Sequence, residues 1–71
     1  MELIEDPRHG VDLLRRSRIV QGFTQHELAQ ATGTKQSAIS ESETAGSMNL
    51  GTYMIMAAAL GFRVALVPME E

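Results

Sequence analysis

Few side chains in this sequence are suited to catalysis or to metal binding. Two imidazoles, His9 and His26, stand far apart, and the 71 residues contain no cysteine. A structural zinc ion usually takes four ligands, mostly from cysteine and histidine. General acid–base catalysis needs a titratable group held beside a reacting partner, and no pair of carboxylates lies at a useful spacing from either histidine. We therefore expect no metal, no cofactor and no enzymatic activity.

Composition indicates a single small globular domain. Hydrophobic residues make up 44% and charged residues 21% of the chain, which is typical of a folded protein. The longest apolar run, Tyr53 to Leu60, is far shorter than the roughly 20 residues of a membrane-spanning helix. The N-terminus is acidic where a signal peptide would be basic, so we expect a cytoplasmic protein. A core this small, without disulfides, is often stabilised by association, and an oligomer is expected.

The net charge of −3 arises from six basic and nine acidic residues. Many of the acidic residues stand at the two ends of the chain, and the middle is close to neutral. This balance disfavours a protein that binds nucleic acid by charge alone, but it does not exclude a sequence-specific reader.

Residues 24–43, TQHELAQATGTKQSAISESE, predict two short helices around a tight turn. Thr24 and Glu27 have the spacing of a capping box, which starts a helix that ends near Thr32. Gly33 can take the left-handed backbone of the turn. A second helix is expected from about Lys35 to Glu43, capped by either Thr34 or Lys35.

The apolar residues of this segment have the sizes that such a pair of helices needs. Ala29 is small enough for the second helix to cross above it, and Ile39 can pack against Leu28 beneath. Two short helices joined by a glycine-containing turn form a helix-turn-helix motif.

Helices are also predicted on both sides of the motif. Val11, Leu14 and Ile19 indicate one apolar side of a helix from Val11 to about Gln21. Pro7 and Gly10 are helix-breaking residues, so residues 1–10 are expected to form a leader. Residues 44–48 are expected to form a loop, followed by a helix from the cap Asn49 to Leu60-Gly61. Its expected core stripe is Leu50, Tyr53, Ala57 and Leu60, with Met56 beside it.

The spacing of residues that share one face changes from helical to strand-like after that helix. A period of two places Phe62, Val64 and Leu66 on one side and Arg63, Ala65 and Val67 on the other, which predicts a strand that Pro68 ends. A lone strand leaves its backbone groups unpaired, so we favour antiparallel pairing with the same segment of a second copy. The alternative is pairing with residues 2–5 of the same chain. The expected dimer interface is Phe62, Arg63, Val64, Ala65, Leu66 and Val67.

These motifs resemble the Cro/C1-type (Xre) helix-turn-helix family over about residues 11–61. With the strand that follows, the chain is most similar to the HipB-type antitoxins, in which similar C-terminal strands join two protomers; HigA-type antitoxins share the helical core and remain an alternative. The resemblance is carried by Arg18, Gly22-Phe-Thr-Gln25, Glu27-Leu-Ala29, Gly33, Gln36-Ser37, Ile39-Ser40, Glu43 and Ala59-Leu-Gly61.

The resemblance implies a mainly α fold. We expect a four- or five-helix, lambda-repressor-like domain over residues 11–61, with a leader over 1–10. Residues 62–71 are expected to contain both a C-terminal β-strand that pairs across a dimer and a short tail.

The resemblance also implies a DNA-binding surface. Helix 35–43 would enter the major groove, where the Gln36 amide can form a bidentate pair with adenine. Lys35 can bind guanine or phosphate, and Glu41, a departure from the family, could accept from cytosine N4 or face solvent. Thr24 and Gln25 would grip phosphate at the start of the preceding helix. The remaining expected DNA contacts are Ser37, Ser40, Thr44, Gly46 and Ser47.

In the family, residues that match Arg18 and Glu43 form a pair that braces the motif. Met54 and Ile55 lie off the predicted core stripe, and they either pack under the paired strands or offer a surface to a toxin. The expected function is a repressor that binds a palindromic operator as a homodimer and neutralises a HipA-like kinase toxin. The alternatives are a stand-alone transcriptional regulator without a toxin and an interaction module that has lost DNA binding.

Overall fold

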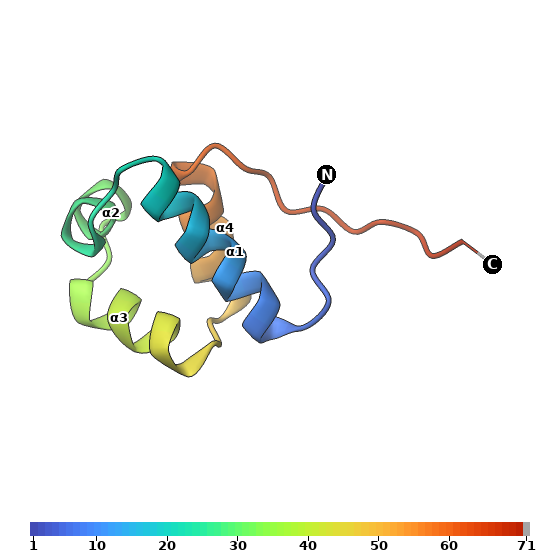
Figure 1. The fold of residues 1–71 in the computed structure, drawn as a ribbon, viewed down its shortest axis with the longest axis horizontal. Coiled ribbons are helices and arrows are strands. Elements are labelled where there is room, and N and C mark those ends of the chain that lie inside the picture. The colour runs from blue at the N-terminus through green and yellow to red at the C-terminus, as the bar shows by residue number, and fades with distance from the viewer. Residues whose placement is uncertain (71) are drawn as a thin grey trace.

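Helices account for all the regular secondary structure in the part of the chain that the structure describes. The computed structural model describes residues 1–70, so Glu71, the last residue of the predicted tail, lies outside it. The helices pack around one another, and the N-terminal residues and the C-terminal tail leave on the same side of the bundle (Figure 1). The mainly α prediction is confirmed. The elements are α1 (Pro7–Val20), α2 (Gln25–Thr32), α3 (Gln36–Ala45) and α4 (Leu50–Ala59).

The first helix begins earlier than predicted. Asp6 is its N-cap, and the Asp6 carboxylate accepts a 2.8 Å hydrogen bond from the His9 amide. Pro7 is suited to the first helical position because its missing N–H would have no partner there in any case. Assigning residues 7–10 to a leader was therefore wrong. Helix α1 also turns Arg18 into the core, while Ile19 is half exposed.

Gly10 permits close packing and does not end the helix. The Tyr53 hydroxyl of α4 donates to the Gly10 carbonyl over 2.7 Å. A Cβ at this position would lie 3.1 Å from Ile4 Cγ2 and 3.4 Å from the Tyr53 hydroxyl. Burial raises the pKa of Tyr53, so the phenol stays a hydrogen-bond donor and ties α4 to α1.

The helix-turn-helix forms as predicted. Glu27 N donates to Thr24 Oγ1 and Thr24 N donates to Glu27 Oε1, each over 3.0 Å, which completes the capping box. Gly33 ends α2 in the left-handed conformation with φ of 68°. Of the two predicted caps, Thr34 and Lys35, the structure has Lys35 as the N-cap residue of α3. Its side chain makes no capping hydrogen bond.

Helix α3 is longer than predicted. Thr44 and Ala45, expected in a loop, form its last turn, and the helix ends at Gly46, whose φ is 71°. Helix α4 begins at its predicted cap, where Asn49 Oδ1 accepts from the Thr52 amide over 2.8 Å.

The core lies where the helices meet. Ile39 of α3 is 2% exposed and packs with Leu28 and Ala29 of α2, as predicted. Leu50, placed on the core stripe of α4, is instead 65% exposed, because that helix turns Met56 inward. The buried apolar residues are Val11, Leu14, Leu28, Ala29, Ile39, Met56, Ala57 and Leu60.

The segment predicted as a strand is extended chain without strand hydrogen bonds. Among residues 1–70 no strand forms, and no backbone hydrogen bond joins residues 2–5 to residues 62–67. The Phe62 amide closes the end of α4 by donating to Ala57 O over 2.7 Å. Val64 packs against the core, whereas Leu66 is fully exposed. The tail then runs away from the helices (Figure 1), so strand pairing across a dimer remains a prediction.

Candidate nucleic-acid interface

Helix α3 exposes a row of polar side chains on the side opposite Ile39. Gln36, Ser37, Glu41 and Thr44 are exposed, and Ser40 is half-buried. Since Ile39 fixes the inner side of the helix, these residues are held outward by the core. Within residues 1–70 no side-chain hydrogen bond or ion pair engages this surface, which we call the α3 face. It comprises Lys35, Gln36, Ser37, Ser40, Glu41 and Thr44.

The start of α2 presents free backbone donors. The capping box uses the amides of Thr24 and Glu27. The amides of Gln25 and His26 between them have no acceptor within the described chain. Hydrogen bonds from Thr24, chiefly from its backbone amide, lower the pKa of Glu27. The carboxylate therefore stays ionised and keeps the first turn of α2 closed.

Arg18 and Glu43 form the brace predicted from the family resemblance. Arg18 Nε donates to Glu43 Oε2 over 2.9 Å, and a second guanidinium nitrogen donates to Glu43 Oε1 over 3.0 Å. Both side chains are about 10% exposed. Another Arg18 nitrogen donates to Phe23 O over 2.8 Å, so one guanidinium joins α1, the turn before α2 and α3.

Gln25 extends this brace to α2. Its Nε2 donates to Glu43 Oε1 over 3.0 Å, a contact that the sequence did not predict because Gln25 was assigned to phosphate. Partial burial disfavours the charged form of Glu43, but the hydrogen bonds from Arg18 and Gln25 outweigh it and lower the pKa of that carboxyl. One carboxylate thus receives donors from two other helices, and α3 is fixed against both.

A second connection holds the far end of α3. Arg8 of α1 donates to the carbonyl of Ala45 over 3.3 Å. Thr44 and Ser47, both predicted to contact DNA, are exposed at this end, whereas Gly46 is buried in the turn. Sequence reasoning missed Arg8 because it assigned that residue to a leader; the Asp6-Pro7 pair, a cap followed by a favoured first residue, is the signal that could have extended α1.

The residues predicted to form the dimer interface follow α4 and lie away from α3 (Figure 1). Phe62 and Val67 are about half exposed, and Met54 and Ile55 of α4 are exposed to a similar degree. A groove of about 470 Å³ lies between α4 and the tail. It is lined by Met54, Ala58, Gly61, Phe62, Arg63 and Val64.

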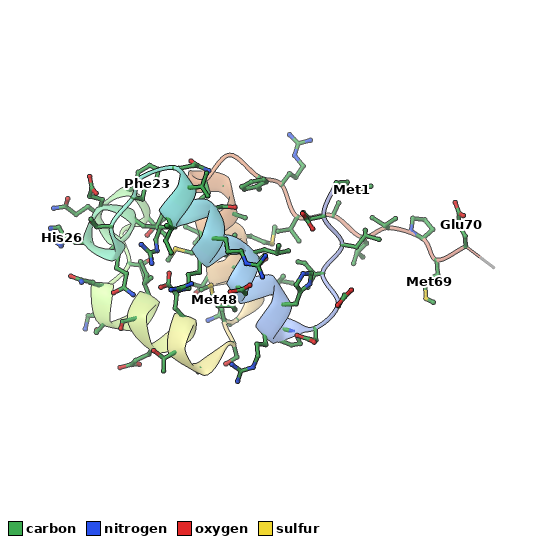
Figure 2. All side chains as sticks on the ribbon, in the orientation of Figure 1. Met1, Phe23, His26, Met48, Met69 and Glu70 are labelled. Carbon is green, nitrogen blue, oxygen red and sulfur yellow. The ribbon has the colours of Figure 1, made fainter. Side chains whose placement is uncertain are left out.

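Neither histidine lies in a metal-binding or catalytic arrangement. His26 points outward from α2 (Figure 2), and His9 Nδ1 accepts from the Glu5 amide over 3.1 Å. Within residues 1–70 no three of the His, Cys, Asp and Glu side chains gather closely enough to hold a metal ion. In the same part of the chain, no helix has the length and apolar character needed to cross a bilayer.

Comparison with solved structures identifies the architecture. A complex of a HipB serine-to-alanine variant with an O2 20mer matches with a TM-score of 0.87 and 27% sequence identity, over 99% of each chain. A HipB–O4 20mer complex matches with a TM-score of 0.85 and 27% identity, over 99% of this chain and 100% of that one. The chain resembles HipB along its whole length. The HipB-type similarity therefore includes the tail as well as the four helices, although no protein-family model and no curated protein matches the sequence.

Proposed function

We propose that this protein is a HipB-type transcriptional repressor that binds duplex DNA through α3. The α3 face carries this proposal, since its polar side chains have no side-chain hydrogen bond or ion pair within residues 1–70 while its inner side is fixed by Ile39 and Glu43. The two similar HipB structures are complexes with 20mers, which supports a nucleic-acid ligand. A rigid helix with unengaged amide, hydroxyl and ammonium groups suits the major groove.

The roles of the interface residues follow from their chemistry. Gln36, in the first turn of α3, has an amide that can form two hydrogen bonds with adenine. Lys35 binds guanine or phosphate, and Ser37 and Ser40 are short enough to reach base edges. Glu41 can accept from cytosine N4.

Phosphate contacts flank these base contacts. The free backbone amides of Gln25 and His26, together with the Thr24 hydroxyl, bind one backbone segment, while the Gln25 side chain stays on Glu43. Thr44 and Ser47 bind at the other end of α3. Because the chain carries a net charge of −3, we expect few phosphate contacts per protomer and a modest dependence of affinity on salt.

The operator-binding form is a homodimer in this proposal. Residues 62–67 pair antiparallel with the same residues of a second copy, which covers Leu66 and Phe62. A two-fold axis through that pairing sets two α3 helices about one helical turn of DNA apart, roughly 34 Å, on a palindromic site.

We further propose that the protein is the antitoxin of a HipA-like kinase. Met54 and Ile55 are exposed apolar residues outside the helix-turn-helix and could contact the toxin. A stand-alone regulator would use the same DNA-binding residues, and a toxin-like reading frame beside this gene distinguishes the two.

The test compares the duplex upstream of the protein's own gene with an unrelated duplex of equal length. Fluorescence anisotropy should show tighter binding to the upstream DNA. Equal affinity for both duplexes would contradict a sequence-specific repressor of its own gene.

A further inference from the structure

Arg8 reaches from α1 to the C-terminal end of α3. Its guanidinium donates to Ala45 O over 3.3 Å. A Cβ built on Gly46 would lie 3.0 Å from both Arg8 Cγ and Arg8 Cζ, so the arginine stem packs directly over the turn that ends α3. Arg8 nevertheless remains exposed to solvent.

The guanidinium keeps most of its hydrogen-bonding capacity. Arginine has five N–H donors, and one contact, to Ala45 O, engages them in the described chain. Three carboxylates line the same hollow as Arg8, and each has another partner: Asp12 pairs with Arg16 at 2.5 Å, Asp6 accepts from the His9 amide, and Glu43 accepts from Arg18. No acidic side chain within residues 1–70 forms an ion pair with Arg8, so its charge is available to an external anion.

The length of α3 places this charge near the DNA backbone. Ten residues span about 15 Å at 1.5 Å per residue, whereas the major groove is about 12 Å wide. A helix whose first turn meets base edges therefore reaches the rim of the groove with its last turn. Thr44 and Ser47 lie at that end but carry no charge, and exposed Glu41 repels phosphate.

We propose that Arg8 binds a DNA phosphate at the C-terminal end of α3. This inference rests on the proposed DNA-binding function and adds a cation, supplied by the first helix, to the contacts assigned above. Arg8 holds α3 through Ala45 O and uses its remaining donors for a phosphate oxygen. A guanidinium is well suited to both tasks because its donors form a rigid planar fork.

The experiment measures affinity for the upstream duplex and for an unrelated duplex over a series of salt concentrations. Removing one phosphate contact makes the slope of log Kobs against log salt less steep by about 0.9 per protomer. Arg8→Ala should show this change on both duplexes, since phosphate contacts are common to all sequences. Arg8→Lys should keep the wild-type slope because it retains the charge.

Arg16→Ala is the matched control. Arg16 is another exposed arginine of α1, but it is paired with Asp12, and the slope should stay at the wild-type value. Thermal unfolding by circular dichroism determines how much of each variant is folded. If folded Arg8→Ala binds with an unchanged slope, Arg8 is a structural cap and the inference is wrong. Failure of the wild-type protein to bind either duplex would instead refute the proposed function itself.

Discussion

At the scale of residues, Gln36 and Glu43 have opposite roles although both belong to α3. The Gln36 side chain is exposed and has no hydrogen-bond partner in the described part of the chain, while Glu43 accepts from two other helices. A change at Gln36 should therefore affect binding alone, and a change at Glu43 should affect the fold on which binding depends.

Gln36→Ala tests base recognition. The affinity for the upstream duplex should fall by about 1–3 kcal/mol, because a bidentate contact to a base is lost, while affinity for unrelated DNA changes little. Anisotropy titrations on the two duplexes measure this difference. Gln30→Ala, which changes an exposed glutamine of α2, is the control and should bind like the wild type. An equal loss on both duplexes would mean that Gln36 contacts only the backbone.

Glu43→Ala tests the brace. Arg18 would keep a nearly buried charge without its carboxylate, and the free energy of unfolding should fall by up to about 3–5 kcal/mol. Urea denaturation measures the loss, and DNA binding should weaken with it. A variant as stable as the wild type would mean that Glu43 does not stabilise the fold.

The lowered pKa of Glu43 adds a dependence on pH. Because the folded state binds this proton less tightly than the unfolded state, the stabilisation is complete above the ordinary pKa of a glutamate, about 4.3, and disappears as pH falls through the lower folded value. Urea denaturation at a series of pH values measures this dependence. In Glu43→Gln, the loss of unfolding free energy that comes from protonating Glu43 should be absent.

At the scale of elements, the turns that end helices have specific backbone requirements. Gly46 ends α3 with φ of 71°, and Arg8 fills the space beside it. Gly51 lies in the first turn of α4, where a Cβ would meet Asn49 Oδ1 at an ordinary 3.5 Å.

These two glycines form a matched pair of substitutions. Gly46→Ala should lower the free energy of unfolding by about 1–2 kcal/mol, because a left-handed backbone is strained for a residue with a Cβ. Gly51→Ala should leave stability unchanged or raise it by up to about 1 kcal/mol, since alanine favours helix. Thermal unfolding of both variants measures the contrast, and equal effects would contradict this account of the α3 turn.

Local sequence signals predicted the elements where a single interaction defines a boundary. The capping box of Thr24 and Glu27, the turn at Gly33 and the cap at Asn49 all depend on neighbouring residues, and all are present. The start of α1 was missed because Pro7 and Gly10 are ambiguous: Pro7 favours the first helical position, and Gly10 is fixed by Tyr53 from a distant helix. The Gln25–Glu43 hydrogen bond likewise depends on tertiary packing that local spacing does not specify.

At the scale of the whole molecule, the tail carries apolar side chains that the helices leave uncovered. Leu66 is fully exposed and Met69 is 93% exposed, yet only Leu66 lies in the predicted pairing segment. The extended backbone of residues 62–67 has no strand partner within the described chain. A partner molecule would supply the missing hydrogen bonds and cover the apolar groups together.

Leu66→Asp tests the predicted dimer. The wild-type chain, 7.8 kDa as a monomer, should sediment with twice that mass, and Leu66→Asp should shift it toward the monomer by placing charge in the interface. Met69→Asp makes the same chemical change outside the segment and should remain dimeric. Analytical ultracentrifugation distinguishes these states, and a Leu66→Asp dimer as tight as the wild type would rule out this mode of association.

The three-helix convergence on the Glu43 carboxylate has a mechanical consequence for the proposed complex. Because Arg18 of α1 and Gln25 of α2 both bond to Glu43 of α3, the proposed recognition helix is held against its own protomer when an operator is slightly too long or too short. In the proposed complex, a mismatch would then be absorbed outside the helical core, and the part that falls on the duplex would twist or kink it at its deformable pyrimidine–purine steps. Base pairs between the half-sites would influence affinity although no side chain touches them.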